Sequence, residues 1–222
     1  MTVLSTEAIR ERLFSEKPQS RLVVSPLLDV ADQLKPGQAS IDVRLGFEFC
    51  LVGPSAYGAL GSIRAEEENN VEEESFDGLY RRQYVPFGAC IVIHPHQFML
   101  AQTLEYIRLP SDLMAYVVGR STWGRLGLIV ATAVGIHPNF AGSLTLELRN
   151  LGETPLTLYP GQTIAQLFFH NVVDQHGKPS AQTNPQAQYT GAVDMVPKRL
   201  SSGPTLDKLR KLIKRFEDRL QT

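Results

Sequence analysis

The sequence predicts an all-β fold, a distorted β-barrel or jelly roll, with a short helix near each end. Between residues 84 and 170, short apolar or alternating runs are separated by Gly, Pro and Asn at intervals of about ten residues. No long helical pattern interrupts these runs, which favours a sandwich or barrel over an α/β fold. The chain has 222 residues, of which 43% are hydrophobic, so one domain can bury a substantial core.

A short helix near the N-terminus is the first expected element. Ser5 or Thr6 can cap it, because a hydroxyl oxygen accepts the free amide hydrogens of a first helical turn. Its apolar side chains then share one face, namely Ile9, Leu13 and Phe14. Residues 22–28 fit an extended segment. Residues 40–46 predict a half-buried strand, because apolar and polar residues alternate there and a glycine closes the run.

The clearest strand covers residues 143–150. Three leucines share the face that we expect to contact the core, and the polar side chains Thr145, Glu147 and Arg149 share the other. Residues 159–162, with the sequence Tyr-Pro-Gly-Gln, predict a turn, and residues 163–169 predict the strand that follows it. We therefore expect a barrel domain over residues 1–173.

The C-terminal part of the chain changes character. Residues 174–203 are rich in Gln, Pro, Ser, Gly and Thr, which predicts a flexible tail that could close over a ligand. Residues 204–222 predict an amphipathic helix with one apolar stripe, formed by Leu206, Leu209, Leu212, Ile213, Phe216 and Leu220. We expect this helix to dock onto protein. A membrane-surface helix is the alternative, although acidic residues interrupt its basic face.

Composition excludes several classes of protein. The net charge of −1 provides no global basic field for DNA or RNA, so we expect no nucleic-acid partner. The N-terminus lacks the pattern of a signal peptide, and no apolar run approaches the ~18 residues of a membrane span, so we expect a cytoplasmic protein. Cys50 and Cys90 lie far apart and form no CxxC pair. They predict two reduced, buried thiols rather than a zinc site.

Three segments carry residue types suited to ligand chemistry, at residues 119–127, 135–142 and 160–168. The first reads Gly-Arg-Ser-Thr-Trp-Gly-Arg-Leu-Gly. Its small residues allow backbone N–H groups to approach a ligand, and two hydroxyls add further donors. Its two arginines provide fixed positive charge for a phosphate or a carboxylate. Each segment alone could be structural, but the order and spacing of all three are specific.

Taken together, these segments resemble dCTP deaminase, whose core is shared with trimeric dUTPases. The resemblance also includes residues 41–46 and 94–98, and so extends over most of residues 5–172. It implies a dUTPase-like β-barrel that forms a homotrimer with sites at the subunit interfaces. It also implies zinc-independent, hydrolytic deamination of dCTP, or a related pyrimidine deoxynucleotide, to dUTP and ammonia. Mg²⁺ would be carried on the triphosphate rather than in a protein cage.

The resemblance assigns roles to individual residues. Glu147 would be the proton shuttle, Arg125 would orient it, and Ser121 would hold the attacking water or the base. The implied nucleotide and phosphate contacts are Arg120, Ser121, Thr122, Gln166, Gln188 and Tyr189. The implied base-recognition residues are Ala131, Thr132, Ala133 and His137. The structural alternative for Glu147 is a pair with Arg149 or Arg125 on a solvated sheet face.

Three departures from the family pattern leave other hypotheses open. His137 stands where the family normally has the aspartate with which dUTPases activate water. The stretch at residues 128–134 is about one residue short, which changes the backbone groups that face a base. Gln188 stands where a lysine normally grips the triphosphate. The alternatives are a dUTPase-like or bifunctional diphosphohydrolase, and a regulatory nucleotide-binding protein that has lost catalysis.

Overall fold

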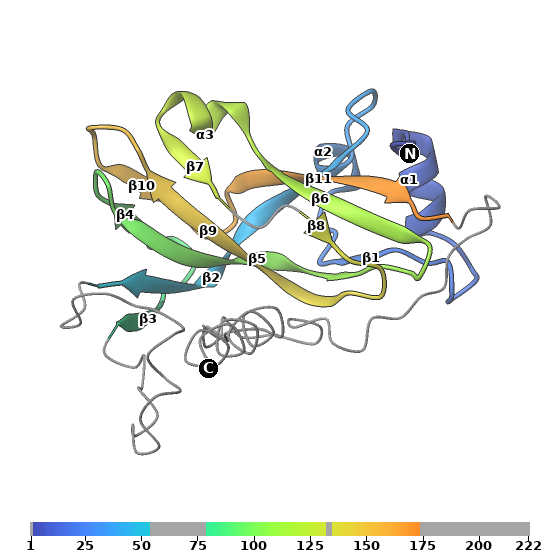
Figure 1. Ribbon diagram of the computed structural model, residues 1–222, viewed down its shortest axis with the longest axis horizontal. Coiled ribbons are helices and arrows are strands. Elements are labelled where there is room, and N and C mark those ends of the chain that lie inside the picture. Colours follow the sequence, from blue (N-terminus) through green and yellow to red (C-terminus); the bar gives the residue numbers. More distant parts are fainter. Residues whose placement is uncertain (1, 54–78, 132–134, 174–222) are drawn as a thin grey trace, which may run out of the picture. The chain divides into compact units, whose positions relative to one another are not determined.

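The computed structural model describes residues 2–53, 79–131 and 135–173 (Figure 1). The chain divides into two compact units, residues 1–52 with 80–195 and residues 53–79 with 196–222. Nearly all the described residues belong to the first unit. The predicted tail at residues 174–203 and the predicted helix at residues 204–222 lie outside the described residues.

Strands dominate the described part of the chain, which confirms the all-β prediction. In chain order the elements are α1 (Thr6–Leu13), β1 (Val23–Ser25), α2 (Val30–Gln33), β2 (Ile41–Val52), β3 (Tyr80–Tyr84), β4 (Ile91–Ile93), β5 (Phe98–Arg108), β6 (Leu113–Gly119), α3 (Ser121–Arg125), β7 (Leu128–Val130), β8 (Gly135–Ile136), β9 (Ala141–Asn150), β10 (Leu156–Leu158) and β11 (Thr163–Asn171). Among the described residues the longest helix is α1, with 8 residues.

One antiparallel sheet carries nine of these strands. Seven follow the order β7-β9-β5-β2-β11-β6-β8, while β1 pairs with β5, β3 pairs with β2, and β4 and β10 form a separate ladder. Although β7 and β6 stand near opposite ends of this order, they touch. A Cβ atom built on Gly119 of β6 would lie 3.1 Å from Cγ2 of Val130 in β7. The sheet therefore curls back on itself like an incomplete barrel, as the sequence predicts.

Alternation along β9 and β5 places the core between the curled faces. Leu144, Leu146 and Leu148 are buried, as their period of two predicts. The paired strand β5 buries Met99, Ala101 and Ile107. This shared apolar face is the main reason why the register between β9 and β5 is fixed, since a slip of one residue would expose all of these side chains.

Helix α1 begins where the sequence predicts. The hydroxyl of Ser5 accepts a hydrogen bond from the backbone N–H of Ala8 at 3.2 Å, and Ile9 and Leu13 are buried. Phe14 was expected on the same face but is 58% exposed, because the helix ends at Leu13 and the backbone turns away there. A bridge between residues 3 and 170 places the start of α1 beside the end of β11 (Figure 1).

Strand β2 corrects a predicted boundary. It does not close at Gly46 but continues to Val52. A Cβ atom at Gly46 would lie 3.0 Å from the carbonyl oxygen of Gln102, so the glycine allows β2 and β5 to approach closely instead of ending the strand. The prediction of a half-buried strand is also wrong at Asp42, which is buried although it lies on the polar side of the pattern.

Two short helices and one thiol also differ from the sequence predictions. Neither α2 nor α3 was predicted, because four or five residues are too few to show a helical period. Cys50 is buried as expected, whereas Cys90 is exposed. Within the described ranges, no helix is long and apolar enough to cross a membrane.

Candidate functional site

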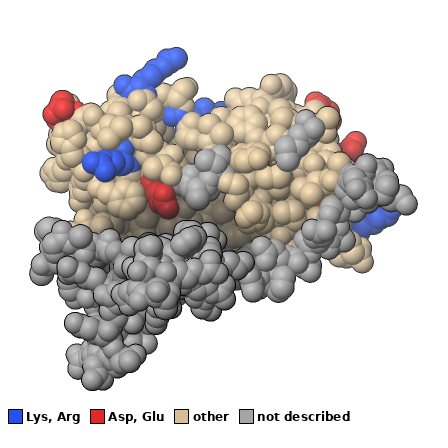
Figure 2. Space-filling model, viewed as in Figure 1, with Lys and Arg blue, Asp and Glu red and all other residues tan. Residues whose placement is uncertain are grey.

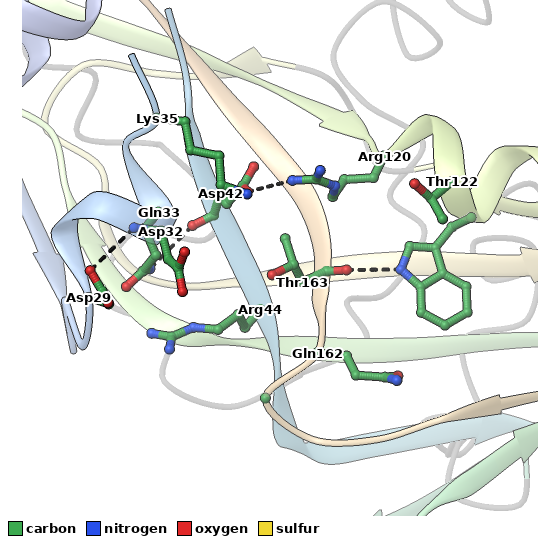
Figure 3. Close-up of a pocket in the computed structure, with 12 residues that line it drawn as sticks. Asp29, Asp32, Gln33, Lys35, Asp42, Arg44, Arg120, Thr122, Gln162 and Thr163 are labelled. Atoms are coloured by element: carbon green, nitrogen blue, oxygen red, sulfur yellow. Dashed lines mark hydrogen bonds and ion pairs between the residues drawn. The ribbon is translucent and has the colours of Figure 1, made fainter. Parts of the chain in front are cut away.

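A cavity of about 530 Å³ opens where α2, β2, α3 and the turn before β11 meet (Figure 3). Its lining comes from three separate parts of the chain, namely Asp29, Asp32, Gln33, Lys35, Asp42, Arg44, Arg120, Thr122, Trp123, Gly161, Gln162 and Thr163. These parts meet because β11 lies between β2 and β6 in the sheet. The predicted turn at residues 159–162 is confirmed, with Gly161 at a φ of 87° that favours glycine.

Asp42 is the centre of the polar contacts in this cavity. Its side chain is 3% exposed and forms an ion pair with Nη1 of Arg120. Its other carboxylate oxygen accepts a hydrogen bond from the amide nitrogen of Gln166 at 3.0 Å. Nζ of Lys35 lies 3.9 Å away. One buried carboxylate thus holds side chains from the N-cap of α3 and from β11, and attracts a third from the loop before β2.

A second buried carboxylate, Glu105, holds two residues that line the cavity, Gln33 and Arg44. It accepts hydrogen bonds from Nε of Arg44 at 2.7 Å, from the backbone N–H of Arg44 at 2.9 Å and from the amide of Gln33 at 3.1 Å. Burial raises the pKa of Glu105, while the hydrogen bonds from Arg44 oppose that rise. The fully buried carboxylate therefore binds the two elements that carry the cavity wall, β2 and α2.

The reason for this arrangement lies in the sheet. Strands β2 and β5 pair at Leu45 and Thr103, but residues 41–44 of β2 have no partner in β5. Their backbone groups still need hydrogen bonds, because an unpaired buried N–H or C=O is costly. Glu105 accepts from the N–H of Arg44, and the amide of Gln33 donates to the carbonyl of Asp42 at 3.3 Å. Side chains thus take the place of β5 along the part of β2 that carries the cavity residues Asp42 and Arg44.

Helix α3 is fastened beside the cavity by the only tryptophan of the chain. Nε1 of Trp123 donates to the carbonyl oxygen of Thr163 at 2.9 Å, which joins α3 to the start of β11 (Figure 3). Arg120 occupies the N-cap position of α3 without a side-chain capping hydrogen bond, and it lines the cavity together with Thr122. Ser121 and Arg125 are exposed on the same helix. The predicted role of Arg125 in orienting Glu147 stays a prediction.

Glu147 lies on a different part of the sheet. It is half-buried on β9, opposite Leu100 of β5, and its carbonyl oxygen accepts a hydrogen bond from the N–H of Ala131 at 2.7 Å. The structure therefore brings Ala131, a predicted base-recognition residue, next to the predicted proton shuttle. His137 is exposed just after β8. Within the described residues, neither Glu147 nor Ala131 lines the cavity that contains Arg120.

Five of the predicted site residues thus form two groups, while Ser121, Arg125 and His137 are exposed outside both. Arg120, Thr122 and Gln166 gather at the cavity and around Asp42, while Glu147 and Ala131 meet on the sheet. Four further predicted residues, Thr132, Ala133, Gln188 and Tyr189, lie outside the described residues. Sequence reasoning missed the central place of Asp42 and the wall residues Lys35, Arg44 and Trp123. The available signal was the pair of charged residues in the otherwise apolar run 41–46.

Acidic and basic side chains are equal in number in the cavity lining. Its lining includes the carboxylates of Asp29, Asp32 and Asp42 together with the cations Lys35, Arg44 and Arg120. On the face shown in Figure 2, basic and acidic side chains are dispersed and form no single basic field. In the parts of the chain that the structure describes, no group of three or more His, Cys, Asp or Glu side chains is placed to hold a metal ion.

Comparison with known proteins identifies the family of this chain. The model of the dCTP deaminase-like family matches residues 3–172. The chain belongs to the dCTP deaminase-like family. Among its curated relatives, a "dCTP deaminase, dUMP-forming" of Methanobrevibacter smithii is 38% identical over 78% of this chain and 81% of its own. A "dCTP deaminase" of Halorubrum lacusprofundi is 35% identical over 86% of this chain and 92% of its own.

A solved structure shows the same fold. The crystal structure of 2'-deoxycytidine 5'-triphosphate deaminase from Agrobacterium tumefaciens matches with a TM-score of 0.55 at 22% identity. The match covers 77% of this chain and 48% of that chain, so this protein spans about half of that longer deaminase. Membership of the dCTP deaminase-like family thus agrees with both the sheet and the resemblance carried by the three sequence segments.

Proposed function

We propose that the protein converts dCTP and water to dUTP and ammonia. The observation that carries this proposal is the cavity lined by Arg120, Thr122 and Asp42, with Gln166 bonded to Asp42, in a chain whose relatives are named dCTP deaminases. The guanidinium of Arg120 and the hydroxyl of Thr122, together with the amide of Gln166 on β11, suit the phosphates of a nucleotide. In this proposal Ser121 also contacts the phosphates, and the tail with Gln188 and Tyr189 completes that part of the site.

Magnesium fits the charge of the cavity. A triphosphate brings several negative charges, which a lining with equal numbers of acidic and basic groups cannot neutralise alone. Mg²⁺ on the triphosphate oxygens supplies this missing positive charge when the nucleotide is bound. The exposed carboxylates of Asp29 and Asp32 are hard oxygen donors that suit its water shell. No zinc takes part in the proposed reaction.

Glu147 is the proposed general base and acid. It takes a proton from the attacking water while the water oxygen forms a bond to C4 of the cytosine, and it passes that proton to N3 as the C4=N3 double bond opens. It then moves the proton of the new C4 hydroxyl to the amino nitrogen, and the C4–N bond breaks as C4=O forms, which releases ammonia. Ser121 would hold the water or the base, and Arg125 would orient the carboxylate. The base would be recognised by Ala131, whose N–H donates to the carbonyl of Glu147, and by Thr132, Ala133 and His137.

The two groups of residues fit a site that is shared between subunits. We propose a homotrimer in which the cavity of one subunit faces the Glu147 strand of another. Mixing inactive Arg120→Ala and Glu147→Gln subunits, then unfolding and refolding them together, tests this directly. Random assortment restores both residues in roughly a quarter of shared sites, so activity should return. Sites contained in one subunit would gain nothing from mixing.

The first experiment follows ammonia and the nucleotide products chromatographically after incubation of the protein with dCTP and Mg²⁺. Conversion to dUTP is expected, and Glu147→Gln should abolish it while leaving the oligomeric state unchanged. Turnover that survives in Glu147→Gln would remove the proposed shuttle. Stabilisation by dCTP without any product would instead indicate a regulatory nucleotide-binding protein that has lost catalysis.

A second candidate function is deamination coupled to pyrophosphate release. The dUMP-forming relative of Methanobrevibacter smithii, at 38% identity, favours it. His137 is exposed just after β8, and an imidazole can act as a general base. The same chromatogram separates the candidates, because the bifunctional enzyme would yield dUMP and pyrophosphate. In that case His137→Ala should shift the product from dUMP towards dUTP.

A further inference from the structure

The carboxylate of Asp42 has an unusual set of partners. It contacts Arg120, Gln166 and Lys35, and two of these three are proposed phosphate ligands. Its side chain is 3% exposed, so the nucleotide can have little direct contact with it. Any influence of this carboxylate on a ligand would therefore have to pass through Arg120, Gln166 or Lys35.

The geometry of Arg120 leaves it available to a ligand. Among the described residues its ion pair with Asp42 uses Nη1 alone, and the side chain remains 26% exposed at the cavity. The guanidinium is planar and presents further donors on Nη2 and Nε. Anchoring one nitrogen fixes the plane and leaves the other donors directed away from Asp42. A free arginine would lose more rotational entropy on binding phosphate.

Gln166 is fixed by the same carboxylate. Its amide nitrogen donates to Asp42 at 3.0 Å and approaches the side-chain oxygen of Gln38 at 3.5 Å. Because a carboxylate only accepts, it determines which end of the amide faces inward. Asp42 is itself held through its backbone, since its carbonyl accepts from Gln33 and the residue pairs with Gln166 across β2 and β11.

We infer that Asp42 is a positioning residue for polyphosphate binding, which sets the orientations of Arg120 and Gln166 before the substrate arrives. The inference rests on the proposed function, because it takes the cavity to be the phosphate site. The rival effect is competition, in which the carboxylate occupies Arg120 and repels phosphate. The two effects have opposite signs. Removal of the charge weakens binding if Asp42 positions its partners, and strengthens binding if it competes.

The test measures the binding of inorganic tripolyphosphate with Mg²⁺, a probe that has neither base nor sugar. Trp123 lines the cavity and is the only tryptophan, so its fluorescence reports occupancy. Loss of one charge-assisted contact corresponds to about a tenfold rise in Kd, which we expect for Asp42→Asn. Arg120→Ala should weaken binding at least as much. Addition of Asp42→Asn to Arg120→Ala should cause little further loss, since Asp42 acts mainly through Arg120.

The matched control is Asp112→Asn. Asp112 forms an ion pair with Arg12 at 2.6 Å, is also largely buried, and does not line the cavity. It should leave the Kd unchanged. If Asp42→Asn does not fold, Asp42→Glu keeps the charge and moves it by one methylene. Weaker binding by Asp42→Glu then supports the inference, and unchanged binding overturns it.

Three results would overturn the inference: tighter or unchanged binding by Asp42→Asn, independent effects of Asp42→Asn and Arg120→Ala, or no binding of tripolyphosphate by the wild type. A wild type that binds tripolyphosphate but does not deaminate dCTP overturns the proposed function alone. The two failures are therefore distinguishable.

Discussion

Replacement of Gly127 by alanine provides a demanding test of the corner between α3 and β7. Gly127 has a φ of 92°, and a Cβ atom there would lie 2.6 Å from the backbone nitrogen and 2.8 Å from the Cα of Gly152. Backbone atoms cannot rotate aside, so the corner must move. A left-handed conformation costs an L-residue about 1–2 kcal/mol, and the overpacking adds about 1–3 kcal/mol. Gly127→Ala should therefore lower the free energy of unfolding by about 2–5 kcal/mol.

Gly124 provides the matched control within the same segment. It lies in α3, and a Cβ atom there has nothing within 4 Å. The same substitution should leave stability unchanged or raise it by up to about 1 kcal/mol, since alanine favours a helix over glycine. Urea unfolding of both variants, followed by circular dichroism at one protein concentration, measures the difference. Equal effects of Gly124→Ala and Gly127→Ala would refute the assignment of strain to this corner.

Three further predictions concern buried or capping polar groups. Burial raises the pKa of Glu105 in the folded protein. The side chain of Glu105 therefore contributes fully to stability below its unfolded pKa of ~4.3, and this contribution is lost as pH rises through the folded pKa. The stability of the wild type relative to Glu105→Gln, measured by urea unfolding from about pH 4 to pH 8, should therefore fall with pH; an increase contradicts the direction. Glu105→Ala leaves Arg44, 12% exposed, without its carboxylate, and should cost about 3–5 kcal/mol in the same assay. Asp112→Ala, which breaks the more exposed Arg12 pair, should cost only about 1 kcal/mol, so equal losses would refute the comparison. Ser5→Ala removes the cap of α1 and should cost about 1 kcal/mol of thermal stability, and an unchanged melting temperature would count against that cap.

The sheet was predictable where one face is apolar and the other polar. The leucines of residues 143–150 alternate with polar residues, and the turn before residue 163 contains the glycine that its backbone requires. The extent of β2 was not predictable in the same way. In the sequence, Gly46 suggests the end of a strand. Only the close approach of the Gln102 carbonyl in the structure shows why a glycine is needed within the strand.

The site was predictable in its residue types but not in its contacts. The segment at residues 119–127 indicated Arg120 and Thr122, and both line the cavity. Their organiser, Asp42, lies 78 residues earlier than Arg120 in the chain. The alternation of residues 40–46 predicted a solvated position for Asp42. The pattern of one strand cannot show that side chains from β11 and from the loop before β2 lie against that position.

The central place of β11 also determines when this domain can fold. This strand is the last element of the described sheet to leave the ribosome, yet it lies between β2 and β6 and is the link between the ladders on either side. Until it emerges, the earlier strands remain two separate groups with unpaired edges. The curled sheet therefore closes late in synthesis, and its long-range pairing makes slow folding the expectation. A chain that stops before Thr163 should lack cooperative unfolding, and its exposed strand edges would make it a substrate for chaperones.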